Sequence, residues 1–170
     1  MTPLPAALGG DGAVRVHRLD RQKYAEDWEA GEGAFQVGGR WNPIGVRAIY
    51  CALDPATAIL EVAVHKGFAV LDAQPHIMTS FTVADPSRIT VVRVEDLPDP
   101  TWLDPYSQSP ERRAWGKDKL RQHRMLVVPS AVSRLSWNLI VNPPLEPGWC
   151  LDVVQEPFVL DPRLNEETSA

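Results

Sequence analysis

The sequence has few of the residues that disulfide frameworks and metal sites require. Only two of its 170 residues are cysteines, Cys51 and Cys150, and they lie in apolar segments without CxxC spacing. The four histidines do not follow the spacing of metal ligands. We therefore expect neither a disulfide framework nor a metal site, and two reduced thiols suit the cytoplasm.

Motifs of several large enzyme classes are also absent. The chain has no P-loop, HExxH or GxSxG motif and no GxGxxG between a strand and a helix, so neither triphosphate hydrolysis nor Rossmann-type dinucleotide binding is indicated. No apolar run is long enough to span a membrane, and the N-terminal residues do not resemble a signal peptide. The net charge of -5 does not suit a surface that binds a phosphate backbone. These features predict a soluble, unexported protein that does not bind nucleic acid directly.

Composition and residue order predict one α+β domain. With 44% hydrophobic residues the chain can bury a sizeable core, and 16 prolines favour a loop-rich fold. We expect a flexible leader over residues 1–12, the domain over 13–164 and a flexible tail over 165–170. Strands outnumber helices, in irregular order. Strands are expected at 13–19, 47–53, 76–83, 89–94, 125–132, 136–143 and 157–160; helices are expected at 21–30, 55–66 and 111–123, with a glycine-rich turn over 31–45.

The helix expected at residues 55–66 has well-marked ends. Asp54 can cap its N-terminus, Pro55 suits its first position, and Gly67 can stop it. Apolar residues at helical spacing predict a buried stripe, with Glu61 at its flank: Ala56, Ile59, Leu60, Ala63 and Val64. In the preceding strand, alternation places Tyr50 opposite the face that carries the larger aliphatic side chains.

Four side chains are notable for their chemistry. Taken singly, Glu61 suits a solvated helix position and Arg40 an exposed cation. Tyr50 suits a core or interface ring, and Ser130 a turn that it caps itself. Together their types fit one task, because an arginine fork binds a diphosphate, a tyrosine ring stacks on a flat heterocycle and a carboxylate stabilises positive charge on a sugar. This combination suits cleavage of a nicotinamide-ribose bond.

The segment GEGAFQVGGRWNPIGVRAIYCALDPATAILEV, residues 31–62, resembles the signature of the RES-domain family. VPSAVSRLSWNLIVNP, followed by FVLDPRL, resembles the C-terminal half of that family, so the similarity runs from Val16 to Leu164. The family takes its name from an arginine, a glutamate and a serine, which correspond here to Arg40, Glu61 and Ser130. The resemblance also points to Arg18 and Tyr50 as residues of the site.

This resemblance implies an ADP-ribosyltransferase-like split β-sheet with short helices, and NAD as the substrate. Family members degrade NAD by hydrolysis or phosphorolysis, or transfer ADP-ribose to a protein. They are toxins of bacterial toxin-antitoxin pairs, so the resemblance implies a cognate antitoxin, typically with an Xre-type DNA-binding domain. Two departures are His17, where the family often has an aromatic residue, and the loosely matching segment 98–123, which leaves the acceptor open.

Under this interpretation Glu61 is the catalytic carboxylate that stabilises the developing charge on ribose. Arg40 and Arg18 hold the diphosphate, and Tyr50 packs against nicotinamide. Ser130 hydrogen-bonds nicotinamide or ribose, or else positions Glu61.

The glycines before Arg40 are expected to let the backbone approach the ligand, at Gly39 in particular. Trp41 and Asn42 are expected to hold the loop, with direct substrate contact as the alternative. Three functions stay open: an NAD glycohydrolase or phosphorylase, an ADP-ribosyltransferase, and a non-catalytic NAD-binding module. All three use the same NAD site and none requires a metal.

Overall fold

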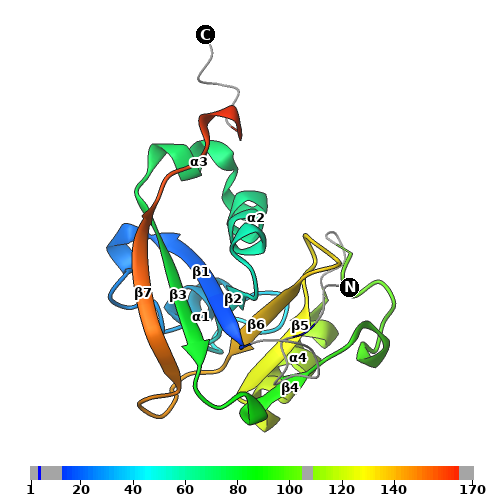
Figure 1. Cartoon of the computed structure of the whole chain (residues 1–170). Coiled ribbons are helices and arrows are strands. Elements are labelled where there is room, and N and C mark those ends of the chain that lie inside the picture. The colour runs from blue at the N-terminus through cyan, green and yellow to red at the C-terminus, as the bar shows by residue number, and fades with distance from the viewer. Residues whose placement is uncertain (1–3, 5–12, 105–108, 165–170) are drawn as a thin grey trace.

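The computed structural model describes residue 4 and residues 13–104 and 109–164. Its strands are β1 (Arg15–Arg21), β2 (Ile49–Ala52), β3 (His76–Val83), β4 (Ile89–Val91), β5 (Met125–Pro129), β6 (Trp137–Val141) and β7 (Cys150–Phe158). Its α-helices are α1 (Glu32–Val37), α2 (Pro55–Lys66), α3 (Phe68–Ala73) and α4 (Pro110–Gln122) (Figure 1).

The strands form one mixed sheet in the order β4-β5-β6-β2-β1-β3-β7. β4 and β5 are parallel, and the other neighbours are antiparallel. β1 pairs along its whole length with β3, but it pairs with β2 only at His17, opposite Ala52. The sheet is therefore nearly divided into a β4-β5-β6-β2 half and a β1-β3-β7 half, which diverge in Figure 1. The predicted single α+β domain is confirmed, and the near-division agrees with the split sheet that the resemblance implied.

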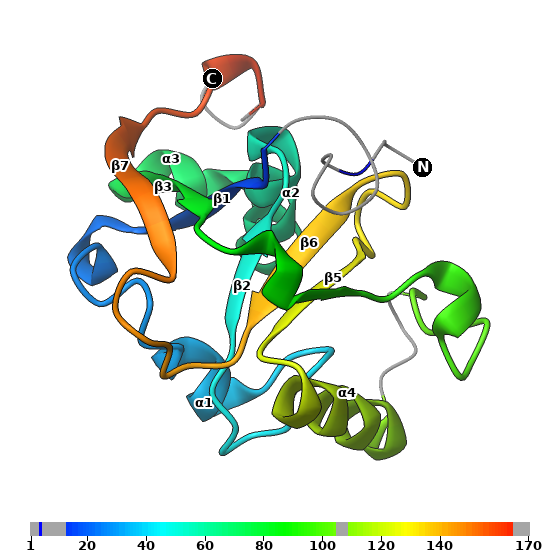
Figure 2. The same ribbon diagram turned by 60° about the horizontal axis from the view of Figure 1, so that its bottom comes forward.

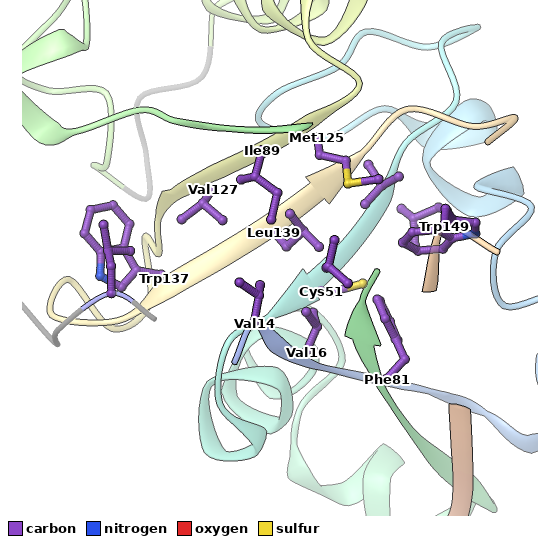
Figure 3. Packing of buried hydrophobic residues seen from close by; sticks show 14 of the residues in the cluster. Val14, Val16, Cys51, Phe81, Ile89, Met125, Val127, Trp137, Leu139 and Trp149 are labelled. Atoms are coloured by element: carbon purple, nitrogen blue, oxygen red, sulfur yellow. The ribbon is translucent and has the colours of Figure 1, made fainter. Parts of the chain in front are cut away.

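One face of the sheet, here called the inner face, carries the main core. Side chains from both halves of the sheet point into one space (Figure 3). The rings of Trp28, Phe81 and Trp149 pack together there, with centroids 5.0 to 5.9 Å apart. Such tilted and edge-on ring pairs add to the stabilisation that comes from burial alone.

Helices cover the opposite, outer face. α2 and α3 pack on the β1-β3-β7 half, where Ala63 and Leu71 meet Leu19 and Met78. α4 packs on the other half through Leu120. In Figure 2, α2 and α3 lie near one end of β2, and α1 and α4 lie near its other end. Outer-face residues of β2, β5 and β6 therefore lie between two groups of helices.

Helix α2 begins and ends where the sequence predicted. The Asp54 side chain accepts a hydrogen bond from the Thr57 N–H at 2.8 Å, and Gly67, with φ 78°, follows the last helical residue. The predicted stripe is wrong at Ala56, Leu60 and Val64, which are exposed. It is correct at Ala63, which is buried, and at Ile59, which packs against the cluster around Leu19. The residues that the helix buries are Thr57, Ala58 and Ala63. The face that packs on the strands is therefore shifted from the predicted one, and Ile59 and Val62 pack there beside the buried Ala63.

Three other expectations need correction. The helix expected at 21–30 is wrong, since only a 3-10 turn forms there, at Gln22–Tyr24. Burial of Trp28 in the main core fixes the rest of that segment as turns. The segment expected as a glycine-rich turn contains α1, and β7 begins well before the strand expected at 157–160. The side chains of β7 are mostly exposed, so no apolar alternation marked it in the sequence.

The leader expected at residues 1–12 is described only at Leu4, which is buried in the main core. The other leader residues and the tail at 165–170 lie outside the described residues.

Candidate active site

Glu61 lies on α2 and is held by two side chains from the other half of the sheet. Ser130, which follows β5, donates its hydroxyl hydrogen to Glu61 Oε1 at 2.9 Å. Asn138 of β6 donates from Nδ2 to the same oxygen at 2.5 Å. Ser130 is fully buried and Asn138 is 9% exposed, whereas Glu61 is partly exposed. One carboxylate oxygen is thus fixed from inside the protein while the group still reaches solvent.

The hydroxyl of Ser130 is fully engaged within the protein. In addition to donating to Glu61, Oγ accepts hydrogen bonds from the N–H groups of Val132 at 3.2 Å and Ser133 at 3.1 Å. A hydroxyl has one hydrogen and two lone pairs, so no capacity remains for a ligand. Of the roles predicted for Ser130, this geometry supports the positioning of Glu61.

Arg40, in the loop between α1 and β2, places a positive charge near this cluster. Its Nη1 donates to the carbonyl oxygens of Trp102 at 2.7 Å and Asp104 at 3.2 Å. Burial lowers the pKa of the Arg40 guanidinium, and the negative charge of Glu61 acts in the opposite direction. No salt bridge to Arg40 is recorded among the described residues. Its charge is therefore suited to an anionic ligand.

Tyr50 lies on the outer face, as strand alternation predicted, and its hydroxyl is bonded to the Arg40 loop. The hydroxyl donates to Asn42 Oδ1 at 2.6 Å and accepts from the Trp41 N–H at 3.2 Å. Burial raises the pKa of this hydroxyl, so it stays a protonated donor. A Cβ atom on Gly39 would lie 2.5 Å from the Tyr50 hydroxyl oxygen. This packing explains the glycine, and its approach to a ligand stays a prediction.

Trp41 and Asn42 lie inside the protein. Asn42 is 0% exposed, and its Nδ2 donates to the carbonyl groups of Ala34, Pro43 and Val46. Trp41 packs against the rings of Trp102 and Trp115, with centroids 5.3 and 5.9 Å away. These contacts support the loop-holding role rather than substrate contact. They also give the loosely matching segment 98–123 a structural task, because it carries the rings and carbonyls that hold the Arg40 loop.

Arg18 is engaged elsewhere. By alternation it shares the inner side of β1 with Val16, away from α2. Its guanidinium pairs with both carboxylate oxygens of Asp20, at 2.7 Å from Nη2 and 2.5 Å from Nε. Its Nη1 donates to the carbonyl oxygen of Tyr50 at 2.7 Å, which joins β1 to β2 where their ladder ends. Among the described residues no hydrogen bond links Arg18 to Glu61, so its place in the site stays a prediction.

Asn138 is the residue of this cluster that the sequence analysis missed. The available signal was an amide side chain inside an apolar strand, WNLIV, because a buried polar group must find a partner. That pattern marks a polar contact but does not say which residue supplies the partner. The partner, Glu61, is 77 positions away in the sequence.

A cavity of about 870 Å³ lies on the inner face, away from the Glu61 cluster. Its lining includes Trp28, Ile49 and Trp149, and it includes none of the predicted site residues. Over residues 13–104 and 109–164 no three His, Cys, Asp or Glu side chains gather in a way that could hold a metal ion. No helix in the described part of the chain is both long and apolar enough to cross a bilayer. Charge and hydrogen bonding, rather than cavity size, thus mark the candidate site.

Comparison with known proteins places the chain in a family. The RES domain model matches residues 15–161. Toxin Res of Photorhabdus laumondii is 32% identical over 133 residues, which cover 75% of this chain and 81% of that protein. The Prs ADP-ribosylating toxin of a Sphingobium species is 27% identical over 135 residues, which cover 73% of this chain and 78% of that protein.

The fold is similar to that in the crystal structure of the M. tuberculosis MbcT-MbcA toxin-antitoxin complex. The match has a TM-score of 0.71 and 21% identity, and it covers 91% of this chain and 88% of that chain. At this identity the match concerns the fold alone. The family model and the relatives show that the chain belongs to the RES domain family.

Proposed function

We propose that this chain is the toxin of a toxin-antitoxin pair and that it cleaves NAD at the nicotinamide-ribose bond. The observation that carries the proposal is the Glu61 carboxylate, which two buried donors fix at one oxygen while the group stays partly exposed. Arg40 adds a positive charge in the same region. A carboxylate beside an arginine suits a substrate with a cationic glycosidic centre and a diphosphate.

The chemistry requires little besides charge stabilisation. When the C1′–N bond breaks, nicotinamide leaves as a neutral molecule with the bonding electron pair, and positive charge develops on ribose. The leaving group needs no proton, so a strong general acid is not required. The Glu61 carboxylate stabilises the charge, and because it is already oriented it needs little reorganisation. Water then attacks C1′ and loses a proton to solvent, which gives ADP-ribose.

Three residues are proposed to hold NAD. Nη1 of Arg40 is used by two carbonyl groups, so Nε and Nη2 are the atoms proposed to bind the diphosphate. The hydroxyl of Tyr50 is engaged as well, so its ring face is the part proposed to pack against nicotinamide. Arg18 would have to exchange Asp20 for a phosphate to take part.

One experiment distinguishes the acceptors. Purified protein is incubated with NAD in buffer alone, with inorganic phosphate, and with cell lysate. Free nicotinamide, ADP-ribose, its phosphate ester and protein-bound ADP-ribose are then quantified, with Glu61→Gln as the control. Nicotinamide with free ADP-ribose indicates hydrolysis, and a phosphate ester indicates phosphorolysis. NAD binding without any nicotinamide release in the three arms would leave only the non-catalytic NAD-binding module.

Transfer of ADP-ribose to a protein is the second candidate function. It is favoured by the similarity to the Prs ADP-ribosylating toxin of Sphingobium, which is 27% identical. The same Glu61 site would serve, because only the nucleophile that attacks C1′ differs. In the experiment above, label that stays bound to a lysate protein and depends on Glu61 would support this alternative.

The partner proposed for this toxin is a cognate antitoxin, typically with an Xre-type DNA-binding domain, that blocks the NAD site in the cytoplasm. The similarity to a toxin-antitoxin complex supports a partner of this kind. Leu60 and Val64 on α2, and Leu135 in the turn between β5 and β6, are exposed apolar side chains on the elements that carry Glu61 and Ser130. Adding the partner should raise the apparent KM for NAD or abolish turnover. A tight complex that consumes NAD at the full rate would contradict this mode of inhibition.

A further inference from the structure

Asn138 occupies a position where an apolar residue is expected. All five residues of β6 are buried, and the other four are Trp137, Leu139, Ile140 and Val141. Asn138 pairs with Ala52 of β2 on one side and with Val128 of β5 on the other, so it lies in the interior of the sheet rather than at an edge. A buried amide in such surroundings lowers stability unless each of its polar atoms has a partner.

Only one end of this amide is paired. Nδ2 donates to Glu61 Oε1 at 2.5 Å. Oδ1 is buried and accepts no hydrogen bond from the residues that the structure describes. The amide cannot gain by turning over, because Oδ1 would then face a carboxylate oxygen and two acceptors would be in contact. Glu61 therefore fixes the direction of the Asn138 amide.

Glu61 does not need Asn138 in order to be solvated. The carboxylate is partly exposed, and Ser130 already donates to Oε1. Without Asn138, Oε1 would keep its hydrogen bond from Ser130, whereas nothing in the described structure compensates the buried Oδ1 of the asparagine. The fold would therefore be at least as stable with an apolar side chain at position 138.

We propose that Asn138 is a positioning residue for Glu61, retained at a cost in stability. With Ser130 as the only donor, the carboxylate could pivot about a single hydrogen bond. A second donor from a different strand fixes the carboxylate plane and directs Oε2 toward the substrate. The positioning part of this inference rests on the proposed NAD reaction. The cost of Asn138 in stability can be measured without that reaction.

The test compares Asn138→Leu with Asn142→Leu, a matched change just beyond the same strand. Asn142 Nδ2 donates to the Leu120 carbonyl at 3.0 Å, a contact that does not involve Glu61. Asn138→Leu should melt at or above the wild-type temperature, lower kcat for NAD at least ~10-fold and keep KM within about twofold. Asn142→Leu should melt several degrees lower and keep kcat. Asn138→Val is the second variant, in case leucine is too large for the site.

The possible outcomes separate this inference from the proposed function. Lower melting temperatures for both Asn138 variants, or failure of both to fold, would make Asn138 a stabilising residue and overturn the inference. An unchanged kcat, or a raised KM alone, would also overturn it. If the wild-type protein releases no nicotinamide from NAD, the proposed function fails. The melting temperatures then test the stability cost of Asn138 on its own, which is refuted if both Asn138 variants melt below wild type.

Discussion

Arg18 and Arg40, two arginines near Tyr50, differ in how their charges are compensated. Arg18 is paired with both oxygens of Asp20, two residues away on the same strand, and its remaining donor ties β1 to β2. Among the described residues, the hydrogen bonds of Arg40 all go to carbonyl oxygens, and the nearby Glu61 belongs to a cluster of its own. The difference teaches that residue type does not decide whether an arginine is ready for an anionic ligand. What decides it is whether neighbouring groups compensate the positive charge of the arginine.

Of the changes near Arg40, Glu61→Gln should have the largest effect on turnover. It removes the charge that opposes the developing cation but keeps the shape and the contacts of Oε1, so turnover should fall at least ~10²-fold. The protein should stay folded, because the amide keeps the shape of the side chain and its oxygen can still accept both hydrogen bonds. The measurement is nicotinamide release together with urea unfolding. Glu95→Gln, at an exposed glutamate that is not part of the cluster, is the control and should behave as wild type. Near wild-type turnover in Glu61→Gln would make Glu61 an ordinary solvated helix residue.

Arg40→Lys and Arg18→Lys test the two arginines directly. Lysine keeps the charge but loses the planar fork. At Arg40 we expect the KM for NAD to rise about tenfold, with a smaller change in kcat and a smaller fall in melting temperature than at Arg18, because the lysine ammonium can still donate to a carbonyl oxygen. At Arg18 the melting temperature should fall by several degrees, because the pair with Asp20 and the tie to β2 are both disrupted.

Steady-state kinetics and thermal melts on the same preparations measure both effects. An unchanged KM in Arg40→Lys would remove Arg40 from the site. An Arg18→Lys variant with a raised KM and no loss of stability would mean that Arg18 binds the diphosphate instead of holding the strands together.

Gly39→Ala tests why the Arg40 loop needs a glycine. The added methyl group would lie 2.5 Å from the Tyr50 hydroxyl oxygen, so we expect a loss of about 1–3 kcal/mol in unfolding free energy. Gly33→Ala is the control, because a Cβ atom at this position in α1 meets nothing within 4 Å. It should stabilise the protein slightly, since alanine favours a helix. Equal stability of the two variants would refute the packing explanation and favour close approach to a ligand.

His17, the β1 neighbour of Arg18, should give the smallest effect. Its Nδ1 lies 2.8 Å from Ser80 Oγ, and its pKa is lowered from 6.5 by burial first and then by Arg15, with Asp54 opposing. The lowered pKa means that the unfolded chain binds a proton at His17 more readily than the folded chain does. The contribution of neutral His17 to the free energy of unfolding is therefore present above pH 6.5 and is lost as the pH falls below it. Melting temperatures measured from about pH 7.5 down to about pH 5 should therefore fall less in His17→Gln than in wild type. Parallel curves would contradict this assignment.

Local signals predicted α2 and the core strands well. Asp54, Pro55 and Gly67 define both ends of the helix through interactions within a few residues, and the strand around Tyr50 is marked by its own alternation. The helix over 21–30 failed because burial of Trp28 against β3 and the loop before β7 overrides local propensity. Such contacts between distant segments carry no local signal.

The candidate site follows the same rule. The resemblance identified Glu61, Arg40 and Ser130, and the structure brings Glu61 and Ser130 into contact. The resemblance could not reveal that the Ser130 hydroxyl has no capacity left for a ligand, because this depends on two backbone N–H groups in the following turn. It also missed Asn138, whose partner is on another element. The sequence thus named two residues that the structure brings into contact, Glu61 and Ser130, but it did not show how each polar atom is used.

The most direct test of the central claim is the structure of Glu61→Gln with bound NAD, since this variant should bind the substrate without consuming it. The account predicts NAD on the outer face, with the nicotinamide ribose beside residue 61 and the diphosphate on Arg40. NAD bound instead in the inner-face cavity beside Trp28 and Trp149, with residue 61 free of ligand, would contradict it.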